Sequence, residues 1–397
     1  MNIPKRILPL IVISQFCCTS LWFASNGVLN DLIINFGLKS GALGHLTSAV
    51  QLGFISGTLL FAVLTITDRF SPSKVFFVSA ILGALFNLTV VWDGNVFTSI
   101  LVLRFLTGFF LAGIYPVGMK IAADYYSKGL GLSLGFLVGA LVVGTAFPHL
   151  VKSMTGSLPW KAVLLTTSAL ATIGGFLIFL LVPDGPNRKA GQKLDFSAFL
   201  RVFNKPDFRA AAFGYFGHMW ELYAFWAFVP VILNTYNKLH PKVEINVPIW
   251  SFIIIGVGGL ACVIGGYLSL TLGTKRTAFS ALLFSCLCCL ISPWMFSIEM
   301  PLVFLAFLLF WGMVVVADSP LFSTLVANNA SLEIKGTALT IVNCIGFSIT
   351  IFSILLINYL QEISNSNNIY AYLAIGPVLG LIALGTNGRK SKSVLPQ

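Results

Sequence analysis

The chain has 397 residues, of which 57% are hydrophobic and only 9% are charged. An ordinary soluble domain has roughly 25% charged residues, and a soluble protein of this composition would have too little polar surface to stay in solution. The net charge of +11 would favour a nucleic-acid partner only in a soluble chain. Composition therefore excludes an ordinary soluble enzyme or nucleic-acid-binding domain and favours a membrane protein.

Twelve apolar segments, each close to the ~20 residues that cross a hydrocarbon core of ~30 Å, follow one another along the chain. The first six are Leu8–Leu29, Leu43–Ile66, Val75–Trp92, Phe97–Met119, Gly131–His149 and Val163–Val182. The last six are Ala210–Leu233, Val247–Leu272, Thr277–Phe296, Leu302–Val326, Thr337–Leu360 and Tyr370–Leu384. We therefore predict an all-α polytopic membrane protein with six-helix bundles over residues 1–182 and 210–397. A cytoplasmic linker over residues 183–209 joins the bundles.

Lysine and arginine are unequally shared between the two sides of this predicted membrane protein. Eighteen of the 24 fall on the side of the N-terminus, five on the other side, and Arg104 lies within the fourth span. The positive-inside rule then places both termini and the linker in the cytoplasm. The first span is too long for a secretory signal core and has no clear cleavage site. We therefore expect a multi-pass protein of a bacterial inner membrane, with the lipid bilayer as a partner and no nucleic acid.

Identical residues recur 204 positions apart in the two predicted bundles, which indicates an internal repeat. They are Trp22 and Trp226, Leu29 and Leu233, Asn30 and Asn234, Gly108 and Gly312, and Pro116 and Pro320. Transporters built from parallel six-helix repeats bind their substrate near the midplane, where the repeats meet. The repeat therefore predicts two pseudo-symmetric bundles with a site between them.

Ionisable residues inside the predicted spans are few. Glu221 lies in the seventh span, about 18 Å of helix rise beyond Arg209, and so close to the midplane. An intramembrane acid is costly and usually marks an ion or substrate pathway. His218 shares its helix face. Each position also has a structural alternative, namely a hydrogen bond to a neighbouring helix for Glu221 and core packing for His218.

Arg104 and Asp318 are the other ionisable residues well inside a span. Arg104 either faces a cavity or extends outward to the membrane surface. Asp318 either serves the pathway or stabilises a bend at Pro320. A fixed positive charge at Arg104 favours an anionic or zwitterionic substrate, whereas the aromatic seventh span equally suits a larger amphipathic compound.

The chain resembles the major facilitator superfamily over its whole length. The loop TITDRFSPSKV after the second span is similar to the superfamily's signature loop, and it departs from the pattern at Leu64 and Ser71. LRFLTGFFLAG in the fourth span is similar to a second superfamily motif, with Arg104 and Gly108 at matching positions. The fifth span lacks the Gly-Pro pair of drug antiporters, which argues against a proton-driven multidrug exporter.

The resemblance implies that the first, fourth, seventh and tenth spans line a central cavity. The predicted substrate and proton pathway comprises Arg104, Glu221, His218, Asp318, Asn26, Tyr115 and Trp226. The resemblance also implies a cytoplasmic gate between the halves, formed by Asp68, Arg69, Lys74, Asp124 and Lys128. Lys128 and Lys335 are the bases expected to pair with Asp68.

These patterns predict a secondary active transporter that works by alternating access. The first hypothesis is proton-coupled symport of a small organic anion or zwitterion by a monomer, and the alternative is proton-coupled export of a drug, siderophore or other amphipathic metabolite. The sequence contains no GxxxxGKS/T phosphate loop, nucleophile elbow or paired metal ligands, so we expect neither an enzyme nor a cofactor. Short loops without a signalling domain disfavour a membrane receptor.

Overall fold

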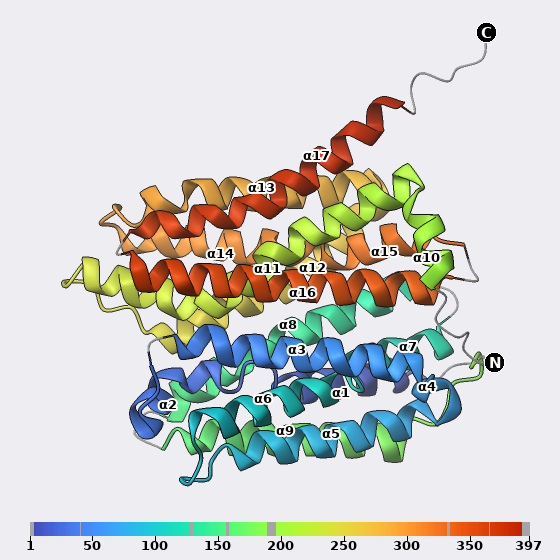
Figure 1. The fold of residues 1–397 in the computed structure, drawn as a ribbon, viewed down its shortest axis with the longest axis horizontal. Coiled ribbons are helices and arrows are strands. Elements are labelled where there is room, and N and C mark those ends of the chain that lie inside the picture. Colours follow the sequence, from blue (N-terminus) through green and yellow to red (C-terminus); the bar gives the residue numbers. More distant parts are fainter. Residues whose placement is uncertain are drawn as a thin grey trace.

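The computed structural model describes residues 4–39, 41–126, 130–155, 159–188, 196–331, 334–364 and 366–390. Within these ranges all regular elements are helices, and they form two bundles that lie side by side (Figure 1). Eleven helical stretches are long and apolar enough to cross a membrane, and Ile7–Thr19 is a shorter apolar helix. The predicted all-α membrane fold with twelve spans is confirmed.

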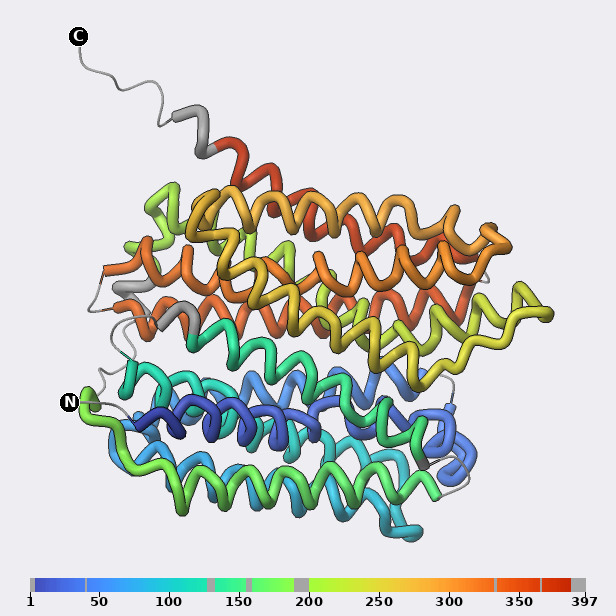
Figure 2. Tube along the Cα trace, turned by 180° about the vertical axis from the view of Figure 1, so that it is seen from behind, coloured from blue at the N-terminus to red at the C-terminus, as the bar shows by residue number. Residues whose placement is uncertain are grey.

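The first bundle contains spans 1 to 6. Its elements are α1 (Ile7–Thr19), η1 (Asn26–Val28), α2 (Leu29–Phe36), α3 (Ala42–Val63), α4 (Ile66–Arg69), α5 (Pro72–Thr89), α6 (Phe97–Leu111), α7 (Tyr115–Tyr125), α8 (Leu130–Thr155) and α9 (Lys161–Leu181). The start of α1, α4 and α10 lie at one end of the molecule, here called the near end, and α2 lies at the opposite, far end (Figures 1 and 2).

The second bundle contains spans 7 to 12 and is preceded by a short helix of the linker. Its elements are α10 (Phe196–Phe203), α11 (Pro206–Leu239), α12 (Val247–Leu272), α13 (Thr274–Met295), α14 (Pro301–Ala317), α15 (Ser319–Asn329), α16 (Lys335–Ile363), η2 (Asn367–Ala374) and α17 (Ile375–Lys390). The seventh span begins at Pro206, four residues before the predicted Ala210, because proline suits the first turn of a helix.

Three spans are broken near their middle. Span 1 leaves regular α-helix between Thr19 and Asn26. Spans 4 and 10 break before Pro116 and Pro320, each of which lies in the first turn of the helix that follows. Proline has no N–H and fits a first turn but not a helix interior. The two breaks are 204 residues apart, so the repeat extends to backbone geometry.

The repeat is also visible in the closest helix contacts. A Cβ on Gly108 of α6 would overlap the carbonyl of Val50 in α3, and one on Gly312 of α14 would overlap the carbonyl of Ile254 in α12. Gly108 and Gly312 are 204 residues apart, and so are Val50 and Ile254. Only a glycine allows so close an approach of two helix backbones, which explains why these positions match.

Two seams join the bundles. Along the first, α8 packs on α12, and Gly139 and Gly259 approach each other's carbonyls so closely that an added Cβ would lie 3.1 and 3.0 Å away. Along the second, α3 packs on α16, with the rings of Phe54 and Phe347 4.5 Å apart. At the far end of this second seam, the Gly44 N–H donates to Asn358 Oδ1 at 3.2 Å. The far ends of α3 and α16 are therefore in contact.

Candidate functional site

Glu221 lies in the interior of the second bundle. Its carboxylate oxygen Oε1 accepts hydrogen bonds from Ser285 Oγ of α13 at 2.5 Å and from Trp311 Nε1 of α14 at 2.6 Å. The side chain is only 1% exposed. Both donors are neutral, so they stabilise a charge here without cancelling it. The acid is held by two helices of its own bundle.

His218 and Asp318 form a pair one helical turn from Glu221. His218 Nδ1 of α11 lies 2.8 Å from Asp318 Oδ1, and each side chain is 1% exposed. Asp318 occupies the break between α14 and α15, where the helix interruption lets its side chain reach α11. The structure therefore brings three of the predicted pathway residues into one buried group of titratable side chains.

Arg104 is buried in the first bundle, where its side chain binds main-chain carbonyls at the break of span 1. Its Nη2 donates to the carbonyls of Leu21 at 3.0 Å and Trp22 at 2.6 Å, and its Nη1 donates to Asn87 Oδ1 at 3.0 Å. The arginine side chain is 0% exposed. Carbonyls released by a broken helix need donors inside a membrane, and the guanidinium fork supplies them.

Asn87 of α5 extends this arginine contact to span 6. Its Nδ2 donates to Thr167 Oγ1 at 3.1 Å and to Ser168 Oγ at 2.9 Å, both on α9. One chain of hydrogen bonds thus connects spans 1, 3, 4 and 6. The arginine in span 4 can be recognised from the sequence. Its hydrogen-bond acceptors in span 1 cannot, because they are main-chain carbonyls, which any apolar residue carries.

Asn26, Tyr115 and Trp226 lie where the bundles meet or close to that region. Asn26 Nδ2 donates to Thr47 Oγ1 of α3 at 2.9 Å. Trp226 is fully buried with its ring centroid 5.2 Å from that of Tyr223. Tyr115 is half-buried at the start of α7. These residues are spread over different contacts and do not converge on Arg104.

An aromatic cluster, missed from the sequence, fills the centre between the bundles. It comprises Trp22, Phe54, Tyr223 and Phe347, contributed by span 1, α3, α11 and α16. The Trp22 ring lies 4.8 Å from Phe54, 5.7 Å from Tyr223 and 5.8 Å from Phe347. Aromatic residues are abundant in every span, so composition alone does not single out these four.

Those predicted gate residues that the structure describes lie at the near end of the first bundle. Asp68 pairs with Lys120 of α7 at 3.0 Å rather than with Lys335, so its partner belongs to its own bundle. Arg69 Nε donates to Thr65 Oγ1 at 3.1 Å, and Lys74 is exposed. Lys128 falls outside the described residues.

Arg188, at the start of the linker, ties this near-end network together. It pairs with Asp184 at 2.6 Å and donates to the main-chain carbonyls of Asp68 at 3.2 Å and Phe70 at 2.9 Å. Asp124 is 7% exposed, and its main-chain carbonyl accepts from the Asn187 N–H at 3.0 Å. The linker therefore fastens onto the signature loop, a contact that the loop motif by itself does not reveal.

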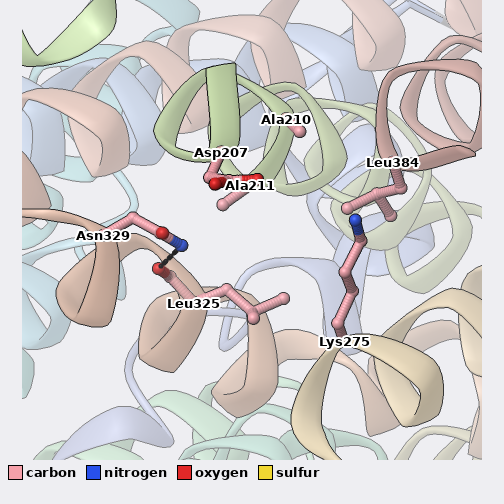
Figure 3. Close-up of a pocket in the computed structure, with 7 residues that line it drawn as sticks. All are labelled: Asp207, Ala210, Ala211, Lys275, Leu325, Asn329 and Leu384. Carbon is pink, nitrogen blue, oxygen red and sulfur yellow. Dashed lines mark hydrogen bonds between the residues drawn. The ribbon is translucent and has the colours of Figure 1, made fainter. Parts of the chain in front are cut away.

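A cavity of about 170 Å³ opens at the near end of the second bundle (Figure 3). Its lining residues are Asp207, Ala210, Ala211, Lys275, Leu325, Asn329 and Leu384. Figure 3 shows the Lys275 side chain extending from one wall and Asp207 on another. None of the predicted pathway residues lines this cavity, so we do not assign it to the transport route.

A sequence model described as Major Facilitator Superfamily matches residues 11–355. The chain belongs to this superfamily. It is therefore a membrane transporter of a small-molecule substrate and not an enzyme. The Bacillus subtilis (strain 168) glycerol-3-phosphate transporter is 26% identical over 157 residues, which cover 38% of this chain and 35% of that protein. The match thus spans about a third of the length of the curated relative.

Solved structures of superfamily transporters share the fold. A bacterial homolog of the human lysosomal transporter Spinster, inward-facing and unoccupied, superposes with a TM-score of 0.71 at 14% identity, over 98% of this chain and 97% of that one. A mutant of the nucleoside transporter NupG gives a TM-score of 0.72 at 15% identity, over 96% and 99%. At these identities the likeness establishes the architecture alone.

Proposed function

We propose that this superfamily member is a proton-coupled symporter whose coupling site is the buried group formed by Glu221, His218 and Asp318. The observation that carries the proposal is their arrangement. Three titratable side chains, each 1% exposed, share the interior of the second bundle: His218 and Asp318 pair at the break of span 10, and Glu221 lies one helical turn from His218 on α11. Buried charges inside a membrane protein are costly and are retained where function needs them.

Proton binding at this group changes the charge that the second bundle has to bury. A proton on Glu221 removes an uncompensated negative charge, and a proton shared by His218 and Asp318 decides whether that pair is ionic. A ligand shifts a conformational equilibrium only by its differential affinity for the two states. We infer that one state exposes this group to water and the other buries it, which couples the proton to the rocking of the bundles.

The organic anion or zwitterion of the first hypothesis is the substrate class supported by the match to the glycerol-3-phosphate transporter. The contacts of Arg104 do not favour it. The two Nη groups already donate to Leu21, Trp22 and Asn87, so only Nε is left for an anion unless span 1 moves. The alternative, an exporter of amphipathic compounds, is supported by the central aromatic cluster.

We also propose that the near end faces the cytoplasm of a bacterial cell, so that both termini lie inside, and that the protein acts as a monomer. The asymmetry of lysine and arginine supports the orientation. Asp68, Arg69, Lys74, Asp124 and Lys128 remain the proposed gate, with Lys120 as the partner of Asp68.

Uptake into proteoliposomes with an imposed pH gradient tests the coupling, after a thermal-shift screen has supplied a transported compound. Glu221→Gln keeps an oxygen for the Ser285 and Trp311 donors but cannot cycle a proton. We expect it to abolish concentrative uptake while leaving exchange of substrate across the membrane. Asp93→Asn is the matched control, because Asp93 is an exposed acid paired with Lys161. Concentrative uptake by Glu221→Gln at the rate of the unmodified protein would remove Glu221 from the coupling site.

A further inference from the structure

Several fully buried polar side chains around the break of span 1 have no hydrogen-bond partner in the described part of the chain. The atoms are Ser25 Oγ, both amide atoms of Gln51, Arg104 Nε, Thr145 Oγ1, His149 Nε2, and the indole N–H groups of Trp22 and Trp226. All seven side chains are at most 3% exposed. Buried polar groups in proteins are nearly always paired, so a concentration of unpaired ones around a single point indicates a ligand site.

Thr145 and His149 face the protein interior from α8. Phe136 and Met154, nine residues to either side of Thr145, are 37% and 78% exposed. Nine residues are two and a half helical turns, so Thr145 lies on the opposite face from both. Its neighbour Gly144 packs on Thr19 of α1. The side chain of Thr145 therefore points between span 1 and α12, with His149 one turn further along.

Gln51 faces span 1 from α3. Thr47, one turn before it, accepts the hydrogen bond of Asn26, and Phe54, one turn after it, contacts Trp22. Residues three and four apart share a helix face, so the amide of Gln51 is directed at the stretch from Trp22 to Asn26. Ser25 belongs to that same stretch.

Trp22 and Trp226 approach the same point from the two bundles. They are 204 residues apart and so occupy matching places in the repeat. Tyr223 lies between them, with ring centroids 5.7 Å from Trp22 and 5.2 Å from Trp226. Two indoles with free N–H donors thus flank one phenol ring at the interface between the bundles.

We propose that these groups form the substrate site and that the substrate is an uncharged, hydroxyl-rich ring compound, namely a sugar or a nucleoside. This assignment refines the transport function proposed above and rests on it. The amide, the hydroxyls and the imidazole supply both donors and acceptors, and the indole and phenol faces pack against a ring. The Arg104 guanidinium lies at the same break, but both its Nη groups are committed to carbonyls and Asn87 and only its Nε is without a partner. It therefore has no free fork with which to bind a carboxylate or phosphate through two bonds, and the other polar groups of the site are neutral amide, hydroxyl, indole and imidazole groups, which favours an uncharged compound.

Isothermal titration of the purified protein tests this assignment with three kinds of probe. A panel of free hexoses and pentoses represents sugars, uridine and adenosine represent nucleosides, and glycerol 3-phosphate represents anions. We expect an uncharged probe to bind and glycerol 3-phosphate to show no heat. Which half of the panel binds distinguishes a sugar from a nucleoside. Binding of the anion alone, or of no uncharged probe, overturns the assignment.

Variants then place the bound probe at this site. Gln51→Leu and Thr145→Val remove polar atoms at nearly constant volume, and each should weaken binding about threefold to tenfold, as expected for a lost hydrogen bond. Trp226→Phe keeps a ring but loses the N–H, and it should act in the same direction. The matched control is Trp220→Phe on the same helix, because that indole N–H already donates to the Tyr372 carbonyl at 3.2 Å.

Unchanged affinity in the folded Gln51→Leu and Trp226→Phe proteins would also overturn the site. If Gln51→Leu does not fold, the isosteric Thr145→Val carries the same comparison. Binding to detergent-solubilised protein needs no proton gradient, so its outcome is separate from that of the coupling. Intact binding of an uncharged probe without pH-driven uptake would contradict only the proton-coupled function.

Discussion

Replacement of Arg104 by methionine, which has similar length and no charge, separates its two possible roles. The side chain makes three hydrogen bonds, to the carbonyls of Leu21 and Trp22 and to Asn87 Oδ1. Hydrogen bonds inside membrane proteins contribute about 0.6 kcal/mol on average and up to about 1.7 kcal/mol. Three bonds from a charged donor therefore predict a loss of about 2–5 kcal/mol of unfolding free energy.

Equilibrium unfolding in mixed detergent micelles measures this loss. Arg104→Lys should show an intermediate loss, because an ammonium group lacks the planar fork that reaches two acceptors at once. In a double-mutant cycle with Asn87→Leu, the two losses should be less than additive, since the residues share one hydrogen bond.

A different result would refute this reasoning. If Arg104→Met unfolds at the same detergent fraction as the unmodified protein but no longer binds the transported compound, Arg104 contacts substrate directly and the bonds to span 1 are incidental. If the variant loses stability while a folded fraction binds with unchanged affinity, the arginine only positions span 1.

Three further predictions concern other contacts. Glu221→Leu leaves its two donors unpaired and should lower the unfolding free energy by about 1–3 kcal/mol more than Glu221→Gln does, as measured by the same titration; equal losses would contradict the contacts. Asp68→Asn and Lys120→Gln each break the same partly exposed ion pair, which contributes about 0.2–1 kcal/mol. Because only one pair is lost in every case, the double variant should transport no more slowly than either single variant. Asn358→Ala removes the acceptor of the Gly44 N–H. Distances measured between spin labels at the far ends of α3 and α16 should then shift toward longer values. An unchanged distance distribution would show that this hydrogen bond does not hold the far end closed.

The spans are predictable because a membrane imposes a length and an apolar composition that are visible in the sequence. The proline-marked breaks before Pro116 and Pro320 follow equally from local chemistry. The break in span 1 does not, because Leu8–Leu29 reads as one apolar run and its carbonyls are satisfied by Arg104, 83 residues from Leu21.

The candidate site is only partly visible in the sequence for a related reason. Buried ionisable residues are rare enough to be found by type, so Glu221, His218 and Asp318 could be identified. The direction in which a side chain points depends on tertiary packing, and Glu221 contacts α13 and α14 of its own bundle. Gln51 and Thr145 carry no charge and attract notice only once their lack of partners is known.

The two seams between the bundles match in position but differ in chemistry. Where α8 meets α12, the contact at Gly139 and Gly259 is backbone against backbone, so little has to disengage when one bundle rolls on the other. Where α3 meets α16, the Phe54–Phe347 contact and the Asn358 hydrogen bond must part. We therefore expect the two bundles to separate at the far end along the α3–α16 seam while the α8–α12 seam stays in contact. Solute would then enter between spans 2 and 11, and the seam on the opposite side would remain closed to lipid.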